Sequence, residues 1–288
     1  MSKNNIQLSQ EDLQKVLASI EIPACPAVVS SAMKEAQADE PDLGRLADLI
    51  TSDPGMSAVT LKLANSVMFG SSTAVTGVRR AVDRLGTNNV IGVIFGTALR
   101  NTLKGAPGAW LDPFWKRTSA LALASSLIAR RQYGISPDAA YTYALFRDAA
   151  MPLMMQRFPE YQGIMAQARQ ERSPLVESET RHFPCSHPVI GSLLVRNWGL
   201  PGILAQAIRF HHEPDAYDVP DSTLPGAALS LIAVTHIAEY LLGETLGTED
   251  VEVDESLFDR AQTFLALSSE DIEDLRSIVA STAEVGHA

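Results

Sequence analysis

The chain has 288 residues, of which 46% are hydrophobic and 20% are charged, so it can bury a sizeable core without disulfides or a structural metal. Its 23 basic and 34 acidic side chains give a formal net charge of −11, which repels nucleic-acid backbones unless a basic patch is segregated. The sequence shows no such patch. Its nearest clusters are the arginine pairs Arg79-Arg80 and Arg130-Arg131, and each pair is expected at a helix end, where a cation complements the helix dipole. We therefore expect no direct contact with nucleic acid.

Cysteine content and hydropathy point to the cytoplasm. The sequence holds only Cys25 and Cys185, which suits a reducing compartment, although counting alone leaves a single bridge open. Residues 1–10 are polar and lack the apolar segment of a signal peptide, and the uncharged stretch 118–129 is shorter than the ~20 residues of a membrane helix. We expect a cytoplasmic protein without membrane contact.

Helical periodicity dominates the first hundred residues. Apolar side chains recur at spacings of three and four over residues 43–50, after the turn at Pro41-Asp42. The pair Asp53-Pro54 predicts an N-cap and a first helical residue for the next helix. The side chains of that helix expected to face the core are Met56, Val59, Leu63 and Val67. Residues 20–104 are therefore expected to form one helical subdomain.

A boundary between subdomains is predicted after residue 104. Gly105, Pro107 and Gly108 follow one another too closely for any helix to continue through them. The pair Asp112-Pro113 is expected to begin the next helix, and Ser136-Pro137 the helix after it.

The rest of the chain also has the helical period. A long apolar helix is predicted over residues 225–242, and the acidic carboxyl-terminal region is expected to add two helices, at 255–266 and 269–280. The chain is thus predicted to be all-α. The expected divisions are residues 1–19 as an N-terminal tail and first helix, 20–104 and 105–243 as helical subdomains, and 244–288 as an acidic helical extension.

Histidines are the side chains most suggestive of chemistry. The nucleophile-elbow, P-loop, dinucleotide-binding and C-x-x-C patterns are all absent from the sequence. All six histidines fall in the second half of the chain, and histidines on several helices can converge on a metal ion. Five of them fall within residues 182–236, and these are His182, His187, His211, His212 and His236.

Each histidine also has a structural explanation. The string H-x-x-C-x-H at residues 182–187 offers three soft ligands, but a structural zinc site needs a fourth, so loop histidines are favoured there. The pair His211-His212 suits a helix C-terminus, where imidazolium complements the dipole. His236 lies on an apolar stripe and is expected to be a hydrogen-bonded core residue.

Several motifs occur in order along the chain: LKLANS at residues 61–66, Phe69-Gly70, residues 78–86, HPVIGSLL at 187–194, NWGLP at 197–201, and the pair His211-His212. Together they resemble the HDOD family, the HD-related output domains of bacterial signalling proteins. The resemblance spans about residues 20–242. It implies two helical subdomains, the second related to the HD phosphohydrolases.

The resemblance also allows the metal ligands of catalytic HD enzymes to be sought in this sequence. The early histidine position falls near Thr118, the His-Asp pair on Arg147-Asp148, and the later carboxylate on Glu239. Arginine cannot ligate a metal because its guanidinium stays protonated. Only Asp148, His187 and the pair His211-His212 remain of a recognisable site, so we expect no dinuclear centre, no bound metal and no cofactor.

Arg147 has two interpretations. If it points into the HD-like pocket, its fixed charge repels a metal ion and its fork suits a carboxylate or phosphate, so the pocket is either a charge-paired core or a site for a small anionic ligand. Alternatively, Arg147 lies on an outer face. Asp148 is expected to form a salt bridge more readily than to bind a ligand.

Two functions follow from the resemblance. The favoured one is a non-catalytic output module of a two-component or nucleotide-signalling system, acting on a response regulator, sensor kinase or nucleotide-signalling enzyme. Because the chain has no room for a fused receiver domain, its input is expected to arrive in trans. The alternative is a metal-dependent phosphohydrolase with unusual ligands.

Overall fold

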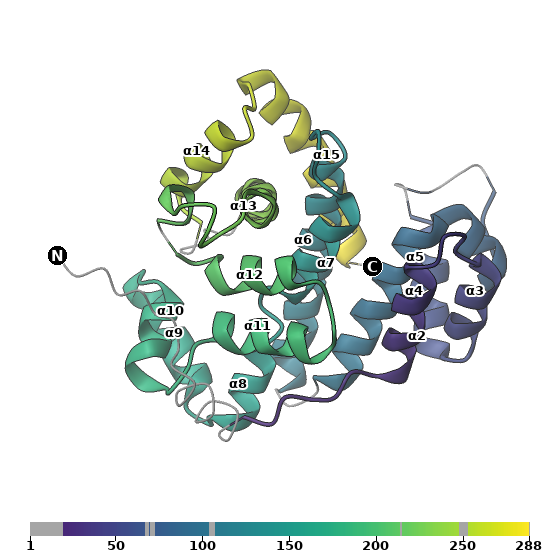
Figure 1. Cartoon of the computed structure of the whole chain (residues 1–288), viewed down its shortest axis with the longest axis horizontal. Helices are drawn as coiled ribbons and strands as arrows, with labels where there is room; N and C mark the ends of the chain where they lie inside the picture. The colour runs from purple at the N-terminus through teal and green to yellow at the C-terminus, as the bar shows by residue number, and fades with distance from the viewer. Residues whose placement is uncertain are drawn as a thin grey trace.

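The computed structural model describes residues 20–66, 69, 73–103, 107–213, 215–247 and 253–287, and these residues form helices and no strand. The all-α prediction is confirmed. Helices α2 (Ala27–Ala36), α3 (Leu43–Thr51), α4 (Pro54–Ala64) and α5 (Val78–Thr102) gather at one end of the molecule (Figure 1). The expected tail at 1–19, the residues Val67 and Gly70, and the boundary residue Gly105 lie outside the described residues.

Side-chain caps start α3 and α4 as predicted. Asp42 accepts hydrogen bonds from the backbone N–H groups of Gly44 and Arg45, and Asp53 accepts one from Met56. The predicted inner face of α4 is only partly right. Met56 is buried, but Val59 is 44% exposed, because the buried face follows a spacing of four through Thr60 and Ala64.

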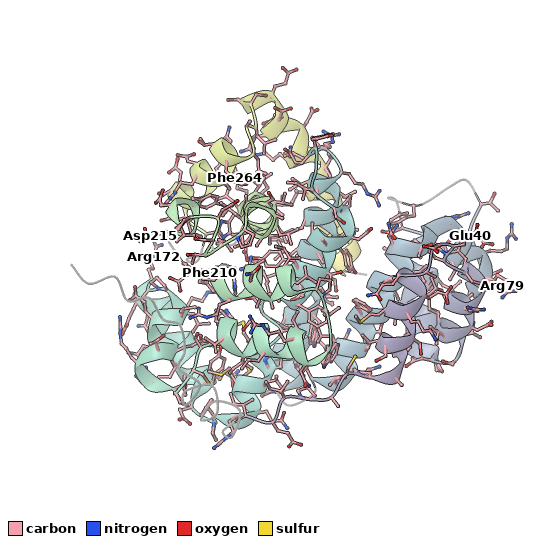
Figure 2. The ribbon with its side chains drawn as sticks, viewed as in Figure 1. Glu40, Arg79, Arg172, Phe210, Asp215 and Phe264 are labelled. Carbon is pink, nitrogen blue, oxygen red and sulfur yellow. The ribbon has the colours of Figure 1, made fainter. Side chains whose placement is uncertain are left out.

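The pair Arg79-Arg80 lies at the start of helix α5 and not at the helix end where a cation complements the dipole. Helix α5 follows the extended backbone of Gly77, so the two arginines lie in its first turn, and the prediction was wrong. Figure 2 shows Arg79 at the outer edge of this subdomain, where its guanidinium lies 3.7 Å from a carboxylate oxygen of Asp48. The helix bends at Gly86, whose φ of 73° falls in the left-handed region that glycine adopts readily.

The second subdomain opens with α6 (Gly108–Ala129), which begins before the predicted start at Asp112-Pro113. Pro113 therefore lies inside the helix. The Pro107 carbonyl accepts from the backbone N–H groups of Trp110 and Leu111, which completes a first turn ahead of the proline. Trp110 also stacks on Phe114, with ring centroids 4.6 Å apart, and stabilises this turn.

A series of shorter helices follows α6 in the second subdomain. The predicted cap Ser136 accepts from Ala139 N–H and starts α7. These elements are α7 (Pro137–Phe146), α8 (Met151–Arg157), α9 (Tyr161–Glu171), α10 (Leu175–His182), α11 (His187–Asn197), α12 (Gly202–Phe210) and the 3₁₀ turn η1 (Ala216–Asp218).

The apolar helix α13 (Gly226–Leu246) lies at the centre of this half of the molecule (Figure 1). It packs against α6 and α12 and is covered by α14 (Glu255–Phe264) and α15 (Ser269–His287). By length and composition α13 alone among the described helices could cross a membrane, but 78% of its most apolar window is buried in the protein, as in a core helix. The acidic extension thus completes the second core.

Helices α5 and α7 make a close contact that yields a stability prediction. A Cβ atom on Gly92 would lie 2.6 Å from Cε1 of Tyr141, whereas on Gly96 its nearest neighbour would be Leu145 Cδ1 at 3.6 Å. Gly92→Ala should lower the free energy of unfolding by about 1–3 kcal/mol through overpacking, measured by urea denaturation. Gly96→Ala is the matched control, and it should gain up to about 1 kcal/mol of helix propensity. Equal stability of the two variants would contradict the close contact.

Candidate functional site

The candidate site forms where the ends of three helices meet in the second subdomain. Arg147 is the C-cap of α7 and Asp148 follows it. His187 is the first residue of α11, while His211 is the C-cap of α12 and His212 comes next. The folding of these helices brings together residues that are far apart in the sequence.

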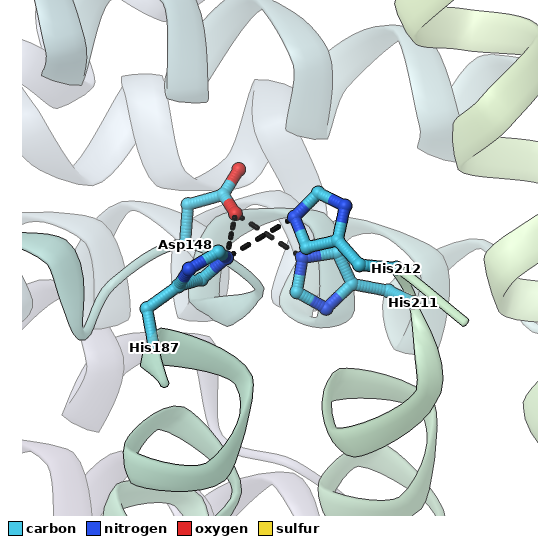
Figure 3. A group of neighbouring side chains, drawn as sticks. All are labelled: Asp148, His187, His211 and His212. Atoms are coloured by element: carbon cyan, nitrogen blue, oxygen red, sulfur yellow. Dashed lines mark hydrogen bonds and ion pairs between the residues drawn. The ribbon is translucent and has the colours of Figure 1, made fainter. Parts of the chain in front are cut away.

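Four of the predicted site residues form one compact group, which we call the Asp-His cluster: Asp148, His187, His211 and His212 (Figure 3). One potential metal-ligand atom from each lies within 4.8 Å of the others. Asp148 Oδ1 is 3.4 Å from His187 Nε2 and 3.3 Å from His211 Nε2, and the Nε2 atoms of His187 and His212 are 3.1 Å apart. The structure therefore brings together the four residues that the sequence analysis left as a recognisable site.

Two of these imidazoles are held from behind by acceptors. His187 Nδ1 lies 2.9 Å from both carboxylate oxygens of Glu179, and His211 Nδ1 donates to the Ile208 carbonyl at 2.7 Å. Glu179 is fully buried, and it also accepts from the His187 backbone N–H and the Tyr161 hydroxyl. Sequence analysis missed Glu179, because the polar helix α10 has no pattern that marks one glutamate as buried.

Burial and charge act differently on the pKa values of the cluster. Burial lowers the pKa of His187, but the Glu179 charge and hydrogen bonds to Asp148 and Glu179 raise it to about 10. Burial and the neighbouring His212 lower the pKa of His211 to about 3, which keeps that imidazole neutral. The pKa of Asp148 is raised by burial, but the Arg147 charge and a hydrogen bond from His187 hold it well below its usual range.

Beside the cluster lies a buried ion-pair network formed by Arg147, Glu239 and Arg117. Arg147 Nη1 pairs with Glu239 Oε2, Arg147 Nε is 3.0 Å from Asp148 Oδ2, and Arg117 Nη2 donates to Glu239 Oε1 at 3.1 Å. The Arg147 side chain is only 3% exposed, so its placement on an outer face is excluded. The predicted salt bridge of Asp148 is present.

The other predicted histidines take structural roles. His182 is exposed and bonds the Ser178 carbonyl, and it joins neither His187 nor the buried Cys185 in any metal-binding group among the described residues. Burial and the charge of Glu179 raise the pKa of the Cys185 thiol to about 12, which keeps it protonated. His236 is buried, and its ring lies within 3.0 Å of the Tyr217 hydroxyl, as expected for a core histidine.

A cavity of about 400 Å³ opens in front of the cluster and the network. Asp148, His187 and His212 reach it, whereas His211 does not line it. The predicted position Thr118 lines it, together with Arg147 and Glu239. The remaining wall is apolar and basic, with Trp110, Phe114, Met151, Met165, Arg117 and Arg169 among its residues.

The donors present fit one metal ion and do not fit two. In the Asp-His cluster, ligand atoms of three imidazoles and a carboxylate lie within 4.8 Å of one another. The three remaining HD-type positions hold a hydroxyl at Thr118, a guanidinium at Arg147 and a carboxylate at Glu239 that is already paired with two arginines. A guanidinium has no lone pair for a metal.

Comparison with known proteins identifies relatives of the sequence. The family model of the HDOD domain matches residues 22–214, which is more than half of the chain. An uncharacterized protein of Treponema pallidum (strain Nichols) is 25% identical over 255 residues, covering 84% of this chain and 47% of the relative. The chain therefore spans about half the length of this curated relative.

Crystal structures share the fold at low sequence identity. An HDOD domain protein of unknown function from Geobacter sulfurreducens superposes with a TM-score of 0.71 at 22% identity, covering 94% of this chain and 97% of that one. A candidate phosphohydrolase from Shewanella amazonensis gives 0.72 at 20% identity, covering 97% and 98%. A candidate signal transduction protein from Marinobacter aquaeolei gives 0.67 at 20% identity, covering 94% and 60%.

Proposed function

Because the chain belongs to the HDOD domain family, we propose that it is a regulatory output module of bacterial signal transduction that binds a ligand or a protein partner without hydrolysing it. The partners proposed for it are a response regulator, a sensor kinase or a nucleotide-signalling enzyme. In this proposal the input is the binding of a ligand or partner to the second subdomain. The output is a change in the contacts that the surface of this subdomain makes with other proteins.

The observation that most supports this proposal is the buried pair of Arg147 and Glu239. Hydrolysis of a phosphoester in a dinuclear HD site requires two ions that activate a water and hold the phosphate between them. In this chain a guanidinium takes the histidine position of the His-Asp pair, and the later carboxylate is bound to it. The fixed charge of Arg147 would repel an ion placed beside Glu239.

The cavity favours a small anionic ligand as the bound species. Three arginines, Arg117, Arg147 and Arg169, line it against the two carboxylates Asp148 and Glu239, so its wall has an excess of positive charge in a chain whose net charge is −11. The stacked rings of Trp110 and Phe114 give an apolar wall for a planar body. Arg147 is already paired with Glu239 and Asp148, so Arg169, which is exposed, is the better first contact for a phosphate.

The absence of hydrolysis can be measured directly. The full chain incubated with Mn²⁺ or Zn²⁺ and bis(p-nitrophenyl) phosphate is expected to release no nitrophenolate above the buffer blank, because the pair of Arg147 and Glu239 leaves no ligands for a second ion. Turnover that disappears in Asp148→Asn would overturn the proposal and establish the alternative, a metal-dependent phosphohydrolase, which the Asp-His cluster favours.

Binding is separated from cleavage by a thermal-shift measurement on the same preparation. Inorganic phosphate or a nucleotide should raise the melting temperature, and Arg169→Ala should reduce that increase. The matched control is Arg131→Ala, which removes an exposed arginine outside the cavity. Equal shifts in both variants would count against an anionic ligand at this cavity.

A further inference from the structure

We infer that the Asp-His cluster is a site for one divalent transition-metal ion, held by the Asp148 carboxylate and the Nε2 atoms of His187, His211 and His212. This site would hold one ion, whereas a dinuclear centre holds two. Three of its four ligands are imidazoles. The inference stands apart from the proposed function, because a single bound ion can anchor a ligand or rigidify the fold without any hydrolysis.

The hydrogen bonds behind the rings set which nitrogen atoms can bind a metal. A carbonyl oxygen only accepts, so Nδ1 of His211 must carry the proton that bonds the Ile208 carbonyl at 2.7 Å. In the neutral ring Nε2 then presents a lone pair to Asp148 Oδ1 at 3.3 Å. Two lone pairs face each other at this distance, and a cation between them turns that repulsion into two ligand bonds.

His187 is oriented in the same way by Glu179. Its Nδ1 donates to a fully buried carboxylate, and its Nε2 is directed at Asp148 and at Nε2 of His212, so an ion bound there would displace the Nε2 proton into solvent. A carboxylate behind a histidine is the arrangement that fixes the tautomer and increases the basicity of metal-bound imidazoles. Glu179 is therefore a positioning residue of the proposed site.

The spacing of the donors fits an ion of the size of Zn²⁺. Ligand arms of about 2.0–2.1 Å in a tetrahedron give donor separations of roughly 3.3 Å. Three of the six separations are close to this value, at 3.4 and 3.3 Å from Asp148 Oδ1 to His187 and His211 and 3.1 Å between His187 and His212, and all four ligand atoms lie within 4.8 Å of one another. Three nitrogen donors favour Zn²⁺, Co²⁺, Ni²⁺ or Fe²⁺ over Mg²⁺ and Ca²⁺, which prefer oxygen.

Arg147 limits the site to one ion. Its Nε is 3.0 Å from Asp148 Oδ2, so the second oxygen of the carboxylate is already neutralised by a fixed positive charge. The cluster ion would use the other oxygen, Oδ1, which faces the imidazoles. Because Asp148, His187 and His212 also line the cavity, an anionic ligand there could approach the ion.

The test is metal titration of the full chain after removal of bound metal with a chelator. Zn²⁺ should be retained at one equivalent per chain after gel filtration, measured by elemental analysis, and Mg²⁺ should not be retained. Co²⁺ should give visible ligand-field absorption that saturates at one equivalent. Retention of two equivalents, or of none, would overturn the inference.

Variants identify the ligands. His211→Ala and Asp148→Asn should each lose the bound equivalent and the cobalt spectrum, and Glu179→Gln should weaken binding by about 10- to 100-fold. His182→Ala is the matched control, since this exposed histidine lies outside the cluster, and it should keep one equivalent. Circular dichroism checks that each variant is folded. Full retention by folded Asp148→Asn would overturn the assignment, whatever the outcome of the hydrolysis assay.

Discussion

The Glu179→Ala variant is expected to lose about 3–5 kcal/mol of folding free energy, measured by chemical denaturation. Glu179 is fully buried and accepts hydrogen bonds from the Tyr161 hydroxyl, the His187 backbone N–H and His187 Nδ1. Alanine would leave three buried donors without an acceptor, and each unsatisfied donor costs about 1–3 kcal/mol. The loss also frees the segment between α10 and α11, which Glu179 ties together.

The control for this variant lies two residues earlier on the same helix. Glu177 is exposed, and its only described partner is Arg181, one turn away at 2.8 Å. Glu177→Ala should change stability by no more than about 0.5 kcal/mol, as is usual for such surface pairs. If both alanine variants unfold at the same denaturant concentration, Glu179 is not the buried anchor described above.

The Arg147→Met variant should lose a similar amount, about 3–5 kcal/mol, because it leaves the carboxylate of Glu239 buried with less compensation. The Glu239 side chain is 4% exposed, and after the substitution only Arg117 remains beside it, at 3.1 Å. Methionine keeps the unbranched stem and removes the guanidinium, so the effect reports mainly the loss of the charge. Arg131→Met removes a half-exposed pair with Asp274 and should cost less than about 1 kcal/mol.

A double variant tests whether the stability effects of the two buried charges, Arg147 and Glu239, are coupled. In Arg147→Met/Glu239→Leu both buried charges are gone, so stability should recover to within about 1–2 kcal/mol of the parent, as for other buried pairs replaced by apolar residues. Arg117 is one-third exposed and can turn toward solvent. A double variant that is as unstable as the sum of the single variants would contradict the coupling.

Part of the fold could be predicted from the sequence because the signals are local. Asp42, Asp53 and Ser136 cap helices through hydrogen bonds to N–H groups two or three residues away, so short strings of residues predict those helix starts. Reliance on a local signal also explains why the start of α6 was predicted too late in the sequence. An Asp-Pro pair is a strong local signal, but the stacking of Trp110 on Phe114 stabilises an earlier turn that the pair does not reveal.

For the site, the sequence determined which side chains are available and the tertiary structure decided what they form. Arginine in place of histidine at position 147 already limits metal binding, because its protonation does not depend on the fold. That His187, His211 and His212 meet Asp148, and that Glu179 lies behind them, depends on how α7, α10, α11 and α12 pack. Packing is set by burial summed over many residues, which no short stretch of sequence encodes.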